Sequence, residues 1–173
     1  MTGVDALLDL CEQRRLVLMV GYNHRFYPPL QVMKREIEAG RIGQIMTIRA
    51  EVGQYLPDWR PEIDYRESVS ARAELGGGVV LELSHELDYV RWLAGEVDSV
   101  SAQLGRVSDL DIDVEDTADI NLRFSNCVMG SVHMDMVQKP AARGCRVVGT
   151  SGTLLWDWSC HRVSLFDNDI EAW

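Results

Sequence analysis

Alternating apolar and polar positions in the middle of the chain predict a sheet with one covered face. From Met46 to Val52, apolar residues fall on every second position, with Thr47, Arg49 and Glu51 between them. Such strands are typical of an open, mostly antiparallel sheet covered on one side. The same alternation returns at 99–104, 117–124 and 128–135, and shorter strands are expected at 146–148, 153–157 and 162–166.

Helical spacing appears in three other segments, which we expect to form the layer that covers the sheet. One lies near the start, one follows Pro28 and Pro29, and one runs from His85 to about Ala94. The predicted fold class is therefore α+β, an open, mostly antiparallel β-sheet with helices packed on one face. The second face of the sheet is polar, and the pattern leaves open whether it is solvated or packed on a second copy.

The first 22 residues follow a different pattern. After the first helix, Leu16 to Tyr22 is a nearly continuous apolar run, which predicts a strand buried on both faces. A helix followed by one buried strand is what the end of a doubly wound sheet would leave, although one such strand cannot form a sheet alone.

A long segment from Gln54 to Gly78 has no hydrophobic period. Loops of this length in a compact domain tend to be lids or binding loops. A disordered excursion is the alternative, but the segment holds Trp59 and two tyrosines, and aromatic content favours order.

The densest group of chemically active residues follows this segment. Three glycines, Gly76 to Gly78, allow a close backbone approach, and Ser84 is a suitable N-cap for the helix that begins at His85. The helix dipole favours a neutral imidazole there, whereas Glu82 and Asp88 favour the charged form. His85 is thus either a proton acceptor and donor near neutral pH or a histidine that only hydrogen-bonds near a helix start.

Composition excludes several other classes. The net charge is -10 and the pI about 4.8, so we expect neither nucleic acid nor an anionic membrane as partner. No apolar run approaches the roughly 20 residues of a membrane span, and the start lacks the basic region of a secretory signal. The four cysteines are scattered, which favours reduced thiols in a cytoplasmic protein and no metal site. No nucleotide-binding glycine motif is present, so no cofactor-binding residue is expected in this chain.

Taken together, the motifs resemble the Gfo/Idh/MocA family of oxidoreductases from about Val4 to Phe166. The segments that carry the resemblance, in order, are 20–26 (VGYNHRF), 40–43 (GRIG), 55–61 (YLPDWRP), 64–66 (DYR), 76–88 (GGGVVLELSHELD), 92–95 (WLAG), 114–118 (VEDTA) and 149–153 (GTSGT). Each motif alone is weak, but their order and spacing are specific.

The resemblance implies a two-domain enzyme that transfers a hydride between a sugar-like hydroxyl and NAD or NADP. Residues 1–22 would be the helix and strand that end a Rossmann domain, and 23–173 the substrate domain, which often also forms the oligomer interface. A homo-oligomer, such as a dimer, through the open sheet is therefore expected.

The family's acid/base histidine falls on His85, with Glu82 as the catalytic carboxylate. The substrate-binding residues implied by the resemblance are Asn23, Arg25, Trp59, Arg60, Tyr65 and Arg66.

The sequence departs from the family in two respects. The family's acidic residue lies four positions before the histidine, where this chain has Leu81 and places Glu82 one position later. The nucleotide-binding fingerprint and the Glu-Lys-Pro segment with its catalytic lysine are missing, and the chain stops early at Trp173. We therefore expect an inactive isolated domain; a non-catalytic ligand-binding or dimerisation module is the alternative.

Overall fold

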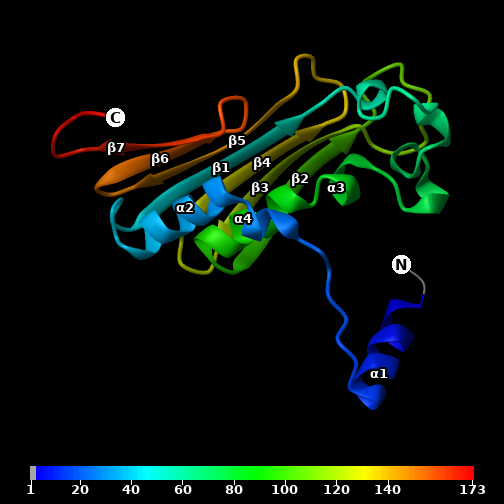
Figure 1. Cartoon of the computed structure of the whole chain (residues 1–173), viewed down its shortest axis with the longest axis horizontal. Helices are drawn as coiled ribbons and strands as arrows, with labels where there is room; N and C mark the ends of the chain where they lie inside the picture. Colours follow the sequence, from blue (N-terminus) through cyan, green and yellow to red (C-terminus); the bar gives the residue numbers. More distant parts are fainter. Residues whose placement is uncertain (1–2) are drawn as a thin grey trace.

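The computed structural model describes residues 3–173 (Figure 1). The α-helices are α1 Val4–Arg14, α2 Pro28–Glu38, α3 Val79–Glu82 and α4 His85–Ala94. Short 3₁₀ helices are η1 Asn23–Phe26, η2 Leu56–Asp58, η3 Tyr65–Glu67, η4 Val69–Ala71 and η5 Ala73–Leu75. The strands are β1 Ile45–Gly53, β2 Val97–Gly105, β3 Thr117–Phe124, β4 Met129–Asp135, β5 Ala142–Gly149, β6 Gly152–Asp157 and β7 Arg162–Asp167.

The seven strands form one open sheet in the order β2-β3-β4-β1-β5-β6-β7. All neighbouring pairs are antiparallel except β1 and β4, which run parallel in the middle of the sheet. The α+β class and the mostly antiparallel sheet predicted from the alternation are confirmed. Residues 125–128 join β3 to β4 in a hairpin, where Cys127 takes a positive φ of 69°.

Helices α2, α3 and α4 lie on one face of the sheet, as Figure 1 shows. Helix α4 packs against β1, and α2 packs against α4 and the β6–β7 hairpin. The core between the two layers is apolar because alternate residues of the central strands point toward the helices. Its largest fully buried side chains include Trp156, Tyr89, Phe124, Leu30 and Met33.

Strand β2 is an exception to the predicted pattern. Its apolar residues Val100 and Leu104 pair with covered residues of β3, yet their side chains are 64% and 53% exposed. Since β2 is the edge strand, its apolar face lies beyond the helices that cover β3 and β4.

The buried strand predicted for residues 16–22 is wrong for this structure. The segment is extended but belongs to no strand, and Val17 is 93% exposed. Helix α1 forms as expected, but it has no buried residue. Figure 1 shows α1 and its linker projecting away from the sheet. The physical reason is that a strand needs neighbours with which to pair, and no part of the described sheet lies beside this segment.

The segment from 54 to 78 is ordered by short 3₁₀ turns and by buried residues such as Leu56 and Ala71. Its three final glycines permit the close approach expected of them. A Cβ on Gly77 would lie 2.3 Å from the carbonyl oxygen of Val69, and one on Gly78 would lie 2.5 Å from a carboxylate oxygen of Glu115. The glycines therefore let this loop fold back on itself immediately before α3.

We expect Gly77→Ala to lower the free energy of unfolding by about 1–3 kcal/mol, because backbone atoms must move to admit the methyl group. Gly105→Ala is the matched control, since a Cβ there meets only Val107, at 4.0 Å. Urea unfolding of both variants checks this, and equal midpoints would contradict the packing account.

Candidate active site around His85

His85 is the first residue of α4, and its ring lies against two aromatic side chains from the segment before α2. The ring centroids of His85 and His24 are 4.4 Å apart, and Tyr22 meets His85 edge-on at 5.7 Å. The preceding Ser84 occupies the N-cap position but makes no side-chain cap hydrogen bond, contrary to the sequence expectation. The Nδ1 atom of His85 is buried without a hydrogen-bond partner among residues 3–173. The other ring nitrogen is therefore the one that a substrate can reach.

A buried ion pair lies beside these rings. Glu86, the second residue of α4, has no exposed surface, and its Oε1 lies 2.9 Å from Nε of Arg143 on β5. That contact is ionic rather than a well-aligned hydrogen bond; a longer one, 3.5 Å, joins Nη2 to Oε2. Nη1 of Arg143 donates to Nε2 of His24 at 3.0 Å. The pair thus links the sheet, α4 and η1.

The local electrostatics keep both imidazoles neutral. Burial, followed by the charge of Arg143 and the proximity of His85, lowers the pKa of His24 to about 4. Burial and Arg143 also lower the pKa of His85, while the charge of Asp88 opposes this. Burial raises the pKa of Glu86 to about 7 against the lowering effect of Arg143. A neutral His85 is a proton acceptor at neutral pH.

Two predicted substrate-binding residues, Asn23 and Arg25, flank His24 on η1. Arg25 makes a bidentate ion pair with Asp88 of α4, with donor–acceptor distances of 2.9 and 2.7 Å. The Oδ1 atom of Asn23 lies 3.2 Å from Nδ1 of His24. The structure therefore brings Asn23, Arg25 and His85 together, with Arg25 held by Asp88.

Glu82, the predicted catalytic carboxylate, lies on α3, and its Oε2 accepts a hydrogen bond from the Ser70 hydroxyl at 2.6 Å. The charged side chains that shift the pKa of His85 are Arg143 and Asp88. Glu82 thus anchors the end of the 54–78 loop to α3. Leu81, at the position of the family's acidic residue, is 49% exposed.

Three of the four predicted loop residues share a cavity, and the fourth lies on the surface. Trp59, Arg60 and Tyr65 line a shallow cavity within the loop, and Trp59 donates its indole N–H to the carbonyl of Gln54. Arg66 is paired with Asp64 on the surface at 2.6 Å. Among residues 3–173, none of these four side chains hydrogen-bonds to His85 or His24, so the structure does not join the loop group directly to the histidine pair.

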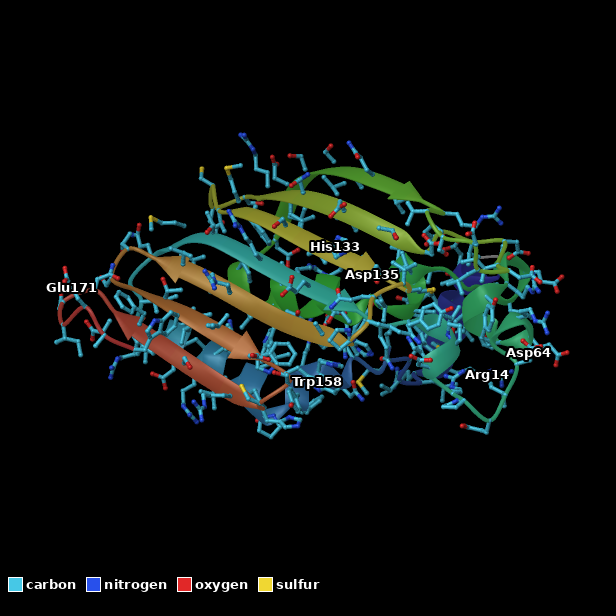
Figure 2. The ribbon with its side chains drawn as sticks, turned by 90° about the horizontal axis from the view of Figure 1, so that it is seen from above. Arg14, Asp64, His133, Asp135, Trp158 and Glu171 are labelled. Atoms are coloured by element: carbon cyan, nitrogen blue, oxygen red, sulfur yellow. The ribbon has the colours of Figure 1, made fainter. Side chains whose placement is uncertain are left out.

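The uncovered face of the sheet carries a wide groove of about 840 Å³. It is lined by polar side chains of the central strands, including Arg49, Glu51, Asp119, His133 and Arg146. His133 lies between Asp119, at 2.7 Å, and the buried Asp135, at 3.2 Å. Burial lowers the pKa of His133, but the hydrogen bonds and charges of the two aspartates outweigh it and raise the pKa. Figure 2 shows His133 and Asp135 on the face opposite the helices.

Two classes of site are not found in the described part of the chain. Between residues 3 and 173, no group of three or more His, Cys, Asp or Glu side chains is placed to hold a metal ion. The helices of this same stretch are too short or too polar to cross a membrane.

Comparison with known proteins identifies the class of domain. Residues 30–165 match the GFO/IDH/MocA C-terminal domain family, which covers most of the chain. The chain therefore belongs to the GFO/IDH/MocA family, as the sequence motifs indicated.

Two dehydrogenases are among the curated relatives. Levoglucosan dehydrogenase of Pseudarthrobacter phenanthrenivorans is 28% identical over 155 residues, which span 73% of this chain and 38% of the relative. Myo-inositol 2-dehydrogenase of Thermotoga maritima is 26% identical over 142 residues, 76% of this chain and 38% of the relative. The chain thus spans about two fifths of the length of these relatives.

Solved structures share the fold. A levoglucosan dehydrogenase in complex with NADH and levoglucosan superposes with a TM-score of 0.78 at 24% identity, over 88% of this chain and 44% of the other. The WlbA dehydrogenase of Bordetella pertussis, in complex with NADH and UDP-GlcNAcA, superposes with a TM-score of 0.78 at 27% identity, over 91% and 48%.

Sequence reasoning missed three residues of the site: His24, Glu86 and Arg143. His24 could have been found, because it lies between the two predicted residues Asn23 and Arg25. The local sequence around Arg143 carries no signal, since its partner His24 lies 119 positions earlier and only the sheet brings them together.

Proposed function

We propose that this chain is the substrate domain of an NAD(P)-dependent oxidoreductase that acts on a hydroxyl or keto carbon of a sugar or sugar derivative. The observation that carries the proposal is the position of His85 at the start of α4 beside His24, where burial and Arg143 lower its pKa. Family membership supports it, as do the relatives that act on levoglucosan and inositol. On this proposal residues 1–22 end a nucleotide-binding domain and 23–173 form the substrate domain.

The described residues do not fit a nicotinamide nucleotide. The sheet has a single parallel pair, β1 with β4, and lacks the glycine-rich turn between a parallel strand and a helix that holds a pyrophosphate. We therefore assign to this chain only the proton half of the reaction. His85 takes the proton of the substrate hydroxyl in oxidation and returns it in reduction. Asn23, Arg25 and Glu82 are proposed to surround the substrate, and the loop residues Trp59, Arg60, Tyr65 and Arg66 to close over it.

The uncovered sheet face supports a second part of the proposal, association of two copies. At the centre of this face, the paired residues Asn121 and Ser131 have polar, uncharged side chains. Side chains of both charge signs lie on either side of them. A face of this kind can pair with itself, because each charge can meet an opposite one across a two-fold axis. The same face favours a non-catalytic dimerisation module as the alternative function.

The chain alone should not bind the cofactor. Titration with NADH and with NADPH, followed by nucleotide fluorescence, should show no saturable binding up to about 1 mM. Any binding free energy would then be weaker than about -4 kcal/mol. An intact family dehydrogenase is the positive control. Saturable micromolar binding would mean that these residues hold a nucleotide after all.

In a protein that joins this chain to a nucleotide-binding domain, His85→Ala should lower kcat by about 10²–10⁴-fold, the usual contribution of a general acid/base. His161→Ala is the matched control, because that exposed imidazole hydrogen-bonds to Tyr27 and meets the ring of Trp158, away from His85. Unchanged turnover in a folded His85→Ala protein would favour the non-catalytic alternative.

Sedimentation should show a dimer at micromolar concentration. Asn121→Arg should weaken association at least about tenfold, the equivalent of 1.4 kcal/mol, because it crowds the positive charges of Arg49 and Arg123 at the centre of the face. Gln31→Arg, exposed on α2 in the opposite layer, should have no effect. A monomeric wild-type chain across the micromolar range would exclude this interface.

A further inference from the structure

The carboxylates near His85 are already engaged by other partners. Glu82 accepts from Ser70, Asp88 is held at two points by Arg25, and Glu86 faces Arg143. The nearest ring to His85 is instead the imidazole of His24. A second imidazole, rather than a carboxylate, is therefore the immediate neighbour of the proposed proton acceptor.

The contact from Arg143 fixes the protonation state of His24. A guanidinium has only N–H donors, so Nε2 of His24, 3.0 Å from Nη1, must accept with its lone pair. The ring proton then lies on Nδ1, which faces the Oδ1 acceptor of Asn23 at 3.2 Å. A doubly protonated His24 would set an N–H against the guanidinium. The geometry alone thus selects one neutral tautomer.

The packing holds this neutral ring over α4. The ring of His24 lies 4.4 Å from that of His85 and stacks with that of Tyr89, 6.5 Å away and one helical turn later. Tyr89 is fully buried and rests on Trp156. His24 therefore cannot swing away from His85 without leaving both the aromatic stack and Arg143.

Arg143 is held in turn by Glu86. Its side chain is 19% exposed, and the fully buried Glu86 offsets its charge once the carboxyl is ionised, above its raised pKa of about 7. Removing one member of such a pair leaves an uncompensated buried charge, which is costly. The contacts thus run from Glu86 on α4 to Arg143 on β5, then to His24 on η1. From His24 they return to α4 at His85.

We propose that Glu86, Arg143 and His24 are positioning residues for His85: Glu86 holds Arg143, Arg143 fixes His24 with its proton on Nδ1, and His24 packs on His85 and keeps that ring neutral and oriented. This inference rests on the proposed function of His85 as proton acceptor. The other ionisable groups that face the two rings are Asp88 with its partner Arg25, Tyr22, Tyr27 and Tyr89.

The test is an NMR titration of this chain, which has only four histidines. In the wild type, ¹⁵N shifts should show His24 with its proton on Nδ1, and both His24 and His85 should titrate below the ordinary histidine pKa. Arg143→Met should raise both pKa values by about one unit or more, because a nearby positive charge is lost. Arg143→Lys should keep them low. Arg146→Met, an exposed neighbour on the same strand, is the control and should change neither.

Glu86→Gln separates electrostatic positioning from loss of structure. It removes the anion that offsets Arg143, so both histidine pKa values should stay low or fall further, whereas unfolding would move them to the ordinary value. If Arg143→Met does not fold, the double variant Glu86→Gln/Arg143→Met removes both charges together and should raise both pKa values. The raised pKa of His133, on the other face, should be the same in all variants and reports an intact sheet.

A His24 proton on Nε2 in the wild type, or a His85 pKa unmoved by Arg143→Met, would overturn the proposal. Its failure is distinct from failure of the proposed function. If His85→Ala loses turnover but Arg143→Met leaves the histidine pKa values unchanged, only the positioning role of Glu86, Arg143 and His24 is rejected. If the histidines titrate as expected but His85→Ala keeps full turnover, only the catalytic role of His85 is rejected.

Discussion

The buried contact between Glu86 and Arg143 is the constraint on which the site depends. It sets Glu86, which has no exposed surface, against Arg143, whose side chain is 19% exposed, so the ionised carboxylate is tolerable in the interior only because the guanidinium faces it. The helix that carries His85 is thereby fixed in position on the sheet. Another N–H group of Arg143 donates to His24. The residue that holds α4 on the sheet therefore also fixes the tautomer of His24 in η1, before α2.

The two faces of the sheet have different physical characters. The covered face is apolar and carries the helices, and the first residues of α4 form the histidine site together with η1. The uncovered face is polar, with a groove and a histidine held between two aspartates. The substrate site and the dimer interface that we propose therefore lie on opposite faces of the sheet.

The sequence predicted the sheet well, because a period of two records directly which residues face the core. It predicted α2 and α4 for a similar local reason, the helical spacing of their apolar residues. It failed at residues 16–22, because an apolar run shows only that a segment needs a partner, not that one is present. It also overestimated the cover of β2, since alternation cannot reveal where a helix layer ends.

The site was predictable only in part. His85, Asn23 and Arg25 lie in short motifs, and the structure brings them together. Arg143 lies on a strand far along the chain, and its pairing with Glu86 depends on strand order, which no local pattern encodes. The loop residues Trp59, Arg60 and Tyr65 line one cavity and Arg66 lies on the surface, and the approach of all four to His85 is still a prediction.

The parallel pairing of β1 with β4 has a consequence for how the chain folds. Strand β1 occupies the centre of the sheet, yet its two neighbours are supplied about 80 to 100 positions later in the sequence. Contacts of such high separation require large loops to close, which slows folding. During synthesis β1 must therefore wait with both edges unpaired until β4 and β5 emerge, and a strand with an exposed apolar face and two free edges is prone to pair with other chains. The strand at the centre of the finished sheet is thus the segment most exposed to aggregation while the chain is being synthesised.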